Sequence, residues 1–241
     1  MASLSIIIPA YNEEKRLPAT LDRVLAYLRE KKFSEAEIVV VDDGSRDGTA
    51  QAVERYRADH PAIRLLRNPG NRGKGFAVRH GMLEAAREWV LFSDADLSAP
   101  IEELDKLLAA AESQRADVAI GSRALDRSLV SVHQPALREW SGRCFNAVMR
   151  LATGLPFRDT QCGFKLYRRD AAQAVFSRQL LDGFSFDVED LMIARALGLK
   201  VIEVPVRWAN VEGTKVSAWQ GLKSFLDLAG IRWNGLKGKY R

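Results

Sequence analysis

The sequence of 241 residues predicts an α/β fold with a mostly parallel central sheet and helices on both faces. Two observations support this fold class. Short apolar runs alternate with helical patterns through the first half of the chain. Each run ends in turn or polar residues, as strands do. Strand–helix alternation of this kind favours parallel strand pairing with the helices packed over the sheet.

In the first half, five β-branched or apolar runs are expected to be strands: residues 4–8, 38–41, 63–66, 90–92 and 118–120. Between them, helical patterns cover residues 15–31, 46–59, 74–88 and 101–114. Pro100 stands directly before the fourth helix, where proline favours a helix start. In such sheets ligands bind beyond the carboxyl ends of the strands, and acidic residues follow the second and fourth strands.

The second half is less regular. Strands are expected at residues 163–167 and 201–204, and helices at 136–152, 187–197 and 217–233. The last helix has a stripe of apolar residues at helical spacing: Ala218, Trp219, Leu222, Phe225, Leu226 and Ala229. Because no repeat or linker divides the chain, we expect one large domain over residues 1–216 and a basic amphipathic helix or tail over residues 217–241.

The positive charge of the chain is concentrated near its C-terminal end. The formal net charge is +5, and the segment from residue 207 onward carries seven Lys and Arg residues against two acidic ones. Such a segment suggests an anionic surface or ligand as a partner, or only a solvated helix face. A basic amphipathic helix with tryptophans can lie in a bilayer interface, and it can equally pack on the core.

Cysteine usage and hydropathy bear on the compartment. Cys144 and Cys162 show neither metal-ligand spacing nor a disulfide framework. No basic region precedes the first strand, and no apolar run approaches the roughly 20 residues that span a bilayer. We therefore expect a cytoplasmic protein, with any membrane contact peripheral and on the cytoplasmic face, either direct or through an integral partner.

Asp94 and Asp96 directly follow an apolar run and are separated by one residue. Two carboxylates at a strand end can share a divalent cation, and Mg²⁺ or Mn²⁺ prefers oxygen ligands while leaving positions open for substrate phosphates. Such an ion would neutralise a diphosphate leaving group. An acidic pair of this kind is also compatible with a solvated turn, so the isolated motif is weak.

Asp42 and Asp43 also follow a predicted strand. Gly44 permits a tight turn, and Ser45 or Asp47 can cap the next helix. Either carboxylate of the pair could bind the base or ribose of a nucleotide, or the motif could be only a strand–turn–helix junction.

Two more segments could bind a nucleotide. In the run from Pro9 to Glu13, Tyr11 could stack on a base and Glu13 could accept a hydrogen bond from it, or the run could be only a loop and a helix start. The glycine-rich segment 68–75 is neither a dinucleotide fingerprint nor a P-loop, since Lys74 is followed by another glycine. It can still present backbone amides and Lys74 to phosphates.

Together these motifs resemble family 2 of the inverting glycosyltransferases, which have the GT-A fold. Pro-x-Tyr-Asn-Glu, Asp-Asp-Gly-Ser-x-Asp-x-Thr, Asn-x-Gly-Lys-Gly and Asp-Ala-Asp occur in order over about the first 125 residues. Each motif alone is weak, but four in register are specific. The resemblance implies metal binding by Asp94 and Asp96. It implies nucleotide binding by Pro9, Tyr11, Glu13, Asp42, Asp43 and Lys74.

The second half resembles the dolichyl-phosphate hexosyltransferases within this family. The segments that carry this resemblance are residues 159–165, 184–189, 206–208 and 213–217. The Gln161-Cys162 pair is similar to the glucosyltransferase branch. That branch usually carries an N-terminal membrane anchor, which we do not expect in this chain from its first residues. Ser98 stands where some mannosyltransferase relatives supply an additional metal ligand.

A lipid monophosphate is largely a dianion at pH 7, because its second pKa lies at about 6. It is therefore already a nucleophile, and the enzyme needs cations that position it more than a strong base. By resemblance we favour Arg123 for this role, although other residues could contact the acceptor phosphate or the sugar. These further candidates are Arg138, Arg143, Asp159, Gln161 and Lys215. Structural roles for Arg138 and Arg143 stay equally open.

Asp187 and Glu189 lie two residues apart near the start of a predicted helix. One of them could orient sugar hydroxyls or act as a base for a hydroxyl acceptor. Their charges are also favourable at a helix N-terminus without any function. With Asp94, Asp96 and Arg123, they complete the expected catalytic set.

The sequence therefore predicts inverting transfer of a hexose from a nucleotide-diphosphate sugar to dolichyl or polyprenyl phosphate, with Mg²⁺ or Mn²⁺ and no nucleic-acid partner. Glucose from UDP-glucose is the first expectation, and mannose from GDP-mannose the second. The sequence is also compatible with a glycosyltransferase that acts on a sugar hydroxyl, and with a nucleotide-sugar-binding module without turnover.

Overall fold

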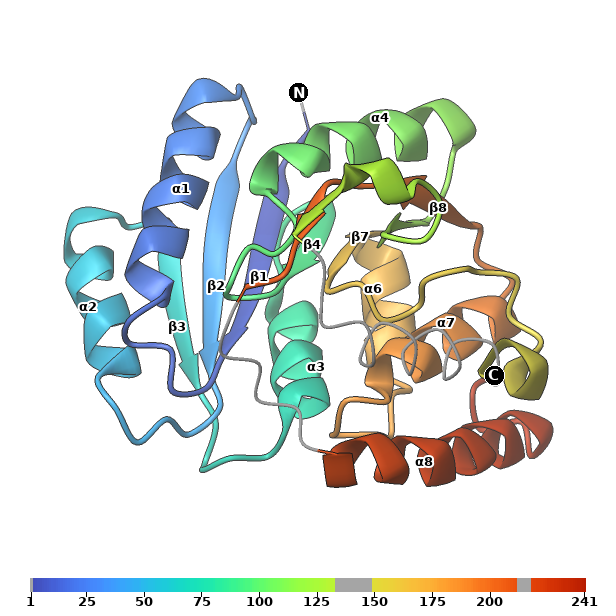
Figure 1. Cartoon of the computed structure of the whole chain (residues 1–241). Coiled ribbons are helices and arrows are strands. Elements are labelled where there is room, and N and C mark those ends of the chain that lie inside the picture. Colours follow the sequence, from blue (N-terminus) through green and yellow to red (C-terminus); the bar gives the residue numbers. More distant parts are fainter. Residues whose placement is uncertain (1, 133–148, 212–217) are drawn as a thin grey trace.

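The structure, a computed structural model, describes residues 2–132, 149–211 and 218–241 (Figure 1). In these residues one sheet contains the strands β1 (Leu4–Ala10), β2 (Ala36–Asp42), β3 (Ile63–Arg67), β4 (Trp89–Ser93), β5 (Val118–Ser122), β7 (Phe164–Arg168) and β8 (Val201–Pro205). Their order is β3-β2-β1-β4-β7-β5-β8. All neighbouring pairs are parallel except those of β7, which runs antiparallel to β4 and β5. The predicted mostly parallel sheet is confirmed.

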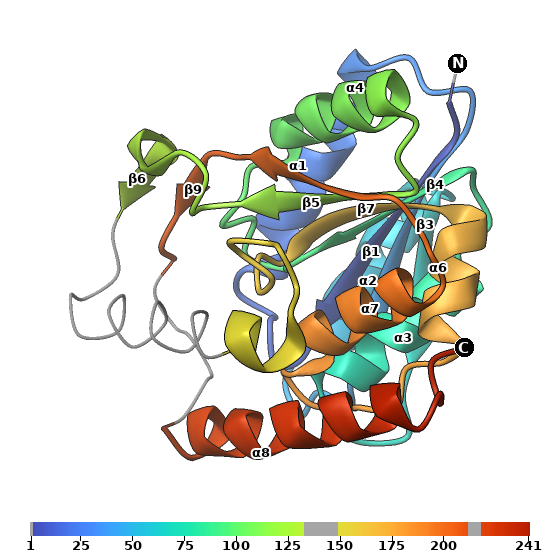
Figure 2. The ribbon, with the colours of Figure 1, turned by 90° about the vertical axis from the view of Figure 1, so that its right-hand side faces the viewer.

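Helices cover both faces of this sheet (Figures 1 and 2). One face is covered by α1 (Leu17–Glu30), α2 (Thr49–Asp59) and α4 (Leu104–Gln114). The other is covered by α3 (Lys74–Glu84), α6 (Arg169–Phe176), α7 (Phe186–Ala196) and α8 (Ala218–Leu236). Alternate residues of β1 supply the two cores: Ile6 and Ile8 are buried against the first set of helices and Ile7 against the second. The sheet is therefore buried on both faces, which explains its nearly continuous apolar strands.

The predicted strands are all present, whereas some helix boundaries differ. The helix expected over residues 74–88 ends at Glu84, because Ala85 is already extended and leads into β4. The helix expected from residue 101 begins with a 3₁₀ turn, Ile101–Glu103, before α4. A second 3₁₀ turn, Arg127–Leu129, precedes β6 (Val130–Val132), which pairs with β9 (Trp208–Ala209) beyond the end of β5.

The helix α6 follows β7 directly and was not predicted. Its eight residues bury Ala171, Ala172, Val175 and Phe176 at helical spacing. This spacing of apolar residues could have indicated the helix in the sequence. Arg168 and Arg169, which precede the apolar residues, instead gave the segment the composition of a loop. The helix predicted over residues 136–152 falls largely outside the described residues, of which 149–153 are helical.

The C-terminal helix α8 packs on the core. Leu228, Ile231 and Tyr240 are buried in the same cluster as the apolar faces of α3, α6 and α7. The predicted boundary between residues 216 and 217 lies outside the described residues, so the division into two parts stays a prediction.

Candidate active site

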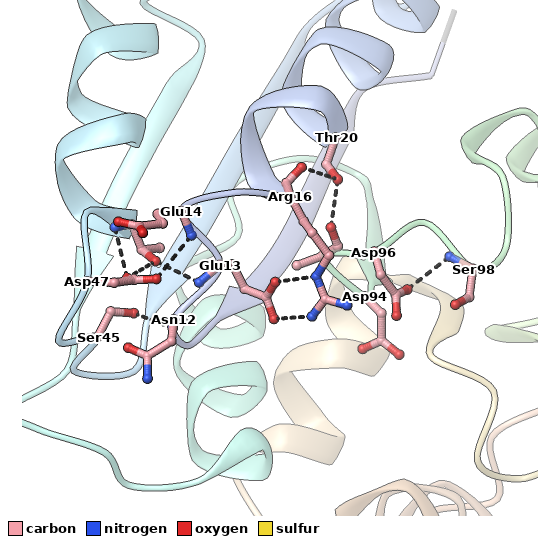
Figure 3. Close-up of polar contacts among 12 residues, drawn as sticks. Asn12, Glu13, Glu14, Arg16, Thr20, Ser45, Asp47, Asp94, Asp96 and Ser98 are labelled. Atoms are coloured by element: carbon pink, nitrogen blue, oxygen red, sulfur yellow. Dashed lines mark hydrogen bonds and ion pairs between the residues drawn. The ribbon is translucent and has the colours of Figure 1, made fainter. Parts of the chain in front are cut away.

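The loops after β1 and β2 are joined by hydrogen bonds at the carboxyl ends of these strands (Figure 3). The backbone amide of Asn12 donates to Ser45 Oγ at 2.9 Å, and that of Glu13 donates to Thr49 Oγ1 at 2.7 Å. Asn12 has a φ of 53°, a left-handed conformation that asparagine tolerates better than most residues. Ser45 therefore binds the first loop instead of capping α2, whose cap position is occupied by Gly48.

Glu13 holds Arg16, a cation that the sequence analysis did not single out. Both carboxylate oxygens of Glu13 accept hydrogen bonds of 2.7 Å from the guanidinium (Figure 3). The hydrogen bond that Arg16 donates to Glu13, together with the charges of Asp96 and Asp94, raises the pKa of Arg16. Glu13 thus contacts Arg16, which lies near the acidic pair, and its expected contact with a base remains a prediction. The three-residue spacing of Glu13 and Arg16 could have indicated this ion pair in the sequence.

Asp43 holds the glycine-rich segment. Its Oδ1 accepts from Asn68 Nδ2 at 2.8 Å and from the amide of Arg72 at 3.1 Å, and its Oδ2 accepts from the amide of Gly73 at 2.8 Å. His80 supports Asn68 in turn, with Nδ1 2.8 Å from Oδ1. The side chain of Asp43 thus supports the loop, and its expected direct contact with a nucleotide remains a prediction.

Asp42 has a more local contact. Its Oδ1 accepts from the amide of Ser45 at 3.0 Å, which closes the turn after β2. Pro9 and Tyr11 are half-buried at the end of β1, beside this turn. Their expected contacts with a nucleotide remain predictions.

Gly73 has a backbone that only glycine adopts readily. Its φ is +108°, and a Cβ atom there would lie 2.4 Å from the carbonyl oxygen of Asp182. The amide of Phe76 donates to the same carbonyl at 3.2 Å. The loop before α7 therefore supports the glycine-rich segment and fixes the start of α3, where Lys74 is the first residue.

Lys74 and the Asp94–Asp96 pair come together as the motifs predicted. Lys74 Nζ lies 2.7 Å from Asp94 Oδ1, while Asp96 Oδ1 accepts from the amide of Ser98 at 2.9 Å. Burial, followed by the charges of Asp96 and Asp187, raises the pKa of Asp94 although Lys74 opposes the shift. Burial lowers the pKa of Lys74, but the charges of Asp94 and Asp187 outweigh it and raise that pKa overall.

This donor set fits a hard divalent cation. Asp94 and Asp96 offer carboxylate oxygens only, which are the ligands that Mg²⁺ and Mn²⁺ prefer. Among the described residues no cluster of three or more His, Cys, Asp or Glu side chains could hold a metal. Asp94 and Asp96 would hold the ion and leave positions open for substrate phosphate oxygens and water.

A small pocket opens beside Asp94. Its lining residues are Ser93, Asp94, Leu97, Ser98, Ala99, Cys162, Gly163 and Trp208. Gly163 is required for this arrangement, because a Cβ atom there would lie 2.0 Å from Asp94 Oδ2. Burial and the charge of Asp159 raise the pKa of Cys162 to about 12, so its thiol is a neutral wall of the pocket at pH 7.

Arg123 and Asp159, both predicted on the acceptor side, form one unit next to this pocket. The guanidinium donates to the two carboxylate oxygens at 2.7 and 2.8 Å, and the Arg123 amide adds a bond of 2.9 Å. The guanidinium also lies 5.3 Å from the centre of the Trp208 ring, which lines the pocket. Burial alone would raise the pKa of Asp159. The charge of Arg123 and a hydrogen bond from the Gln161 backbone outweigh burial and lower this pKa overall. The expected residues Arg138, Arg143 and Lys215 lie outside the described residues.

Asp187 and Glu189 are separated by the fold. Asp187 is close enough to Lys74, Asp94 and Arg123 to shift their pKa values, and it forms a 2.7 Å ion pair with Lys165. It therefore borders the site.

Glu189 has a structural role. Its oxygens accept from the amides of Leu180 and Leu181 at 3.0 and 2.8 Å and from the Tyr240 hydroxyl at 2.8 Å. Its side chain is fully buried in these contacts. Both of its oxygens are engaged away from the acidic pair, and its expected role in catalysis remains a prediction.

Known proteins with similar sequences align with nearly the whole chain. Residues 5–176 match the sequence model of the family described as Glycosyl transferase family 2. The dolichyl-phosphate beta-glucosyltransferase of Drosophila melanogaster is 40% identical, over 99% of this chain and 77% of the relative. The proteins of that name from Homo sapiens and Saccharomyces cerevisiae are both 35% identical over 99% of this chain, and over 77% and 76% of their own lengths.

Solved structures show the same fold. Glucosyl-3-phosphoglycerate synthase from Mycobacterium tuberculosis, in complex with Mn²⁺ and UDP-glucose, has a TM-score of 0.65 at 18% identity, over 95% of this chain and 79% of that one. The mannosyltransferase PcManGT from Pyrobaculum calidifontis, with GDP-mannose and Mn²⁺, has a TM-score of 0.63 at 22% identity, over 94% and 63%.

Proposed function

This chain belongs to glycosyl transferase family 2, and on this premise we propose that it transfers glucose, with inversion, from UDP-glucose to dolichyl phosphate or a related polyprenyl phosphate. The observation that carries the proposal is the similarity to dolichyl-phosphate beta-glucosyltransferases at 35–40% identity, which extends over 99% of the chain for the relatives from fly, human and yeast. The similarity thus includes the second half, where the acceptor-side residues lie.

The donor is bound at the carboxyl ends of β1, β2 and β4. The loop that begins at Pro9 and Tyr11 and the turn after Asp42 contact the nucleotide, while the glycine-rich segment and Lys74 approach the diphosphate. Asp94 and Asp96 would hold Mg²⁺ or Mn²⁺, which offsets the negative charge of UDP as it leaves. The Mn²⁺ in the two solved glycosyltransferases supports this assignment.

The acceptor phosphate approaches from the side of Arg123 and Trp208. An oxygen of the phosphate dianion forms the new bond to C1 of glucose, and the bond from C1 to the UDP oxygen breaks, so no proton has to be removed. Asp159 fixes the guanidinium, and a planar guanidinium suits phosphate.

The geometry favours a phosphate acceptor over a sugar hydroxyl. A hydroxyl acceptor requires a base, and the two candidates were Asp187 and Glu189. Glu189 is occupied by two amides and a tyrosine. Asp187 is paired with the buried Lys165 through a 2.7 Å contact of its Oδ1. We assign Asp187 the orientation of donor sugar hydroxyls instead.

The test is transfer of labelled sugar to polyprenyl phosphate from UDP-glucose and, separately, from GDP-mannose, with Mg²⁺, with Mn²⁺ and with chelator. We expect glycolipid from UDP-glucose that disappears with chelator. Product from GDP-mannose alone would show that the transferred sugar is mannose, while the proposed transfer of a hexose to the lipid phosphate would stand. Retained UDP-glucose binding without product from either donor would overturn the phosphate acceptor and leave the hydroxyl acceptor or the silent binding module.

The exposed face of α8 supports peripheral membrane contact. Leu228 and Ile231 anchor the helix in the core, while Trp233 and Leu236 are 58% and 75% exposed. Lys237 Nζ lies 4.7 Å from the centre of the Trp233 ring, so charge and aromatic surface are adjacent. Such a combination suits the interface of an anionic membrane.

A second exposed apolar side chain lies beside this helix. Arg232 donates a hydrogen bond to the carbonyl of Ala152, next to Leu151, which is 86% exposed. Lys239 and Arg241 add exposed positive charge. In the part of the chain that the structure describes, no helix is long and apolar enough to cross a bilayer. We propose that this surface rests on the membrane that contains the lipid acceptor, on its cytoplasmic face.

A further inference from the structure

Lys165 is the most deeply buried cation next to the candidate site. It lies on β7 between β4 and β5, opposite Phe92 and Ile120, and its side chain is 0% exposed. Its Nζ lies 2.7 Å from Asp187 Oδ1 and 3.0 Å from Asp190 Oδ2, and it donates to the carbonyl of Asp187 at 3.0 Å. One ammonium thus joins two carboxylates and one carbonyl of α7 to the centre of the sheet.

The two carboxylates of this cluster have different surroundings. Asp190 is 0% exposed and accepts a second hydrogen bond, of 2.7 Å, from the Tyr167 hydroxyl. Asp187 instead borders the site, where its charge acts on Lys74 and Asp94. Asp190 and Tyr167 therefore form the inner end of the cluster, and Asp187 forms the end nearer to Lys74 and Asp94.

A buried ion pair of this kind is weak evidence for stability. Removing an ammonium from water costs several kcal/mol, and apolar residues at such positions often stabilise as much. The same cluster is well suited to fix a geometry, because an ammonium with three acceptors leaves its neighbours little freedom. Neither the metal pair nor the acceptor side uses Lys165 directly, so its effect on the site has to pass through Asp187.

We propose that Lys165 is a positioning residue that holds the Asp187 carboxylate in the orientation required to bind the donor sugar, with Asp190 and Tyr167 as its inner support. This inference rests on the proposed function, in which Asp187 contacts the hexose. It assigns specificity for the sugar to a residue that touches neither sugar nor metal.

The test uses variants with matched charge. The ammonium with Asp187 and Asp190 has a net charge of about −1 when both carboxylates are ionised, and Lys165→Met/Asp190→Asn keeps this net charge while removing the ammonium. Asp190→Asn alone is the matched control, because it keeps the pair of Lys165 and Asp187. Burial and neighbouring charges raise the pKa of Asp190 to about 7, so asparagine resembles a protonated form that this side chain readily adopts.

Two measurements separate positioning from folding. Calorimetry with Mn²⁺ gives the ratio of the affinities for UDP-glucose and UDP, which isolates the sugar contribution without any acceptor. Turnover with polyprenyl phosphate gives kcat. Melting temperatures and circular dichroism confirm that each variant folds.

For Lys165→Met/Asp190→Asn we expect the affinity for UDP to be unchanged and the added affinity for UDP-glucose to be lost. We also expect kcat to fall roughly 30-fold, since small misplacements of a positioning group cost about one to two orders of magnitude in rate. Asp190→Asn should lower the added affinity for UDP-glucose and kcat by much less than the double variant, because it keeps the pair of Lys165 and Asp187. Adding Asp187→Asn to the double variant should lower kcat no further, because Lys165 acts through Asp187.

A wild-type affinity ratio in Lys165→Met/Asp190→Asn, or losses that multiply when Asp187→Asn is added, would overturn the inference and leave Lys165 a structural ion pair. A result that contradicts the proposed function is distinguishable from a result that contradicts this inference. If the proposed function is wrong, the wild-type protein makes no glucosylated lipid, while the affinity ratio still reports on the role of Lys165.

Discussion

At the scale of single residues, the site depends on contacts between motifs that are distant in the sequence. Gly163 allows Asp94 its position, Asp43 supports the loop that carries Lys74, and Lys165 holds Asp187. In each case a residue of one motif fixes the functional side chain of another. Substitutions at the supporting residues are therefore expected to affect activity as strongly as substitutions at the metal pair.

Gly163→Ala tests the approach of the backbone to Asp94. The added Cβ would lie 2.0 Å from Asp94 Oδ2, so the carboxylate has to move. We expect a fall in metal-dependent kcat of about 100-fold, as for other misplacements of reacting geometry. Gly230→Ala is the control, since its Cβ would meet nothing within 4 Å. Equal activity of both variants under saturating Mn²⁺ would show that Asp94 needs no fixed position.

Asp43→Ala tests the support of the glycine-rich loop. It removes the acceptor of two backbone amides and the Asn68 amide, which are then left without this partner. We expect a cost of about 1–3 kcal/mol in the free energy of unfolding and a KM for UDP-glucose raised by roughly tenfold. Denaturant unfolding and steady-state kinetics measure the two effects. An increase in KM without any loss of stability would instead support direct nucleotide binding by Asp43.

Asp190 gives a pH-dependent contribution to stability. Burial, followed by the charge of Asp187, raises its pKa from 3.8 to about 7 against the effect of Lys165. A carboxyl with a raised folded-state pKa favours the folded state while it is protonated, so this contribution decreases as pH rises from about 4 to 7. We expect the free energy of unfolding of the wild type to fall relative to that of Asp190→Asn over this interval. A constant difference between the two pH series would contradict the assignment.

At the scale of elements, strands were predicted better than helix faces. Short runs rich in valine, isoleucine and leucine identify the buried strands, because both faces of this sheet are covered. The orientation of β7 could not be predicted, since a buried strand has the same composition in either direction. Lys165 was missed for a related reason: a lone lysine in an apolar run usually marks an edge, and only the central position of β7 buries it.

The pair Asp187 and Glu189 shows how helix geometry divides two equivalent candidates. Residues two apart on a helix lie on nearly opposite sides, so both cannot reach one site. The structure turns Asp187 toward the metal pair and Glu189 toward Tyr240. Both residues were expected in the catalytic set, and the packing of α7 shows that Asp187 is the one that borders the site.

Tyr240→Phe tests the contact between the C-terminal segment and α7. The variant removes the hydroxyl that donates to Glu189 at 2.8 Å, while the ring stays buried. We expect a loss of about 1–2 kcal/mol in the free energy of unfolding and little change in kcat, because Glu189 is structural. Tyr56→Phe is a matched control with a more exposed hydroxyl contact to Asp22. A large loss of kcat in Tyr240→Phe at unchanged stability would restore a catalytic role for Glu189.

At the scale of the whole molecule, the charged and exposed apolar side chains of α8 form a surface that packing of the core does not require. The order of motifs predicted the catalytic half well, because short-range patterns determine strand ends and turns. The sequence left open whether α8 packs on the core or contacts a membrane. The structure shows that Leu228 and Ile231 pack inward while Trp233 and Leu236 stay exposed.

Vesicle binding tests this surface. We expect the protein to bind vesicles that contain phosphatidylserine more tightly than neutral vesicles, because basic groups are attracted to anionic lipid. Trp233→Ala/Leu236→Ala and Lys237→Glu/Lys239→Glu should each weaken binding by about tenfold or more. Arg55→Glu on the exposed side of α2 is the control. Unchanged vesicle binding in both double variants, or a dimer that either one dissociates, would show that another partner covers this surface.

The reversed strand β7 has a consequence for the order in which the chain folds during synthesis. The strands β1 to β4 neighbour one another, so the ribosome releases a set that can pair at once. β5 is made next, but its neighbours in the sheet are β7 and β8, which are still to come. Its apolar edge therefore stays open until residues 164–168 insert between β4 and β5. A nascent chain stalled between these two strands is the stage at which chaperones have most reason to bind.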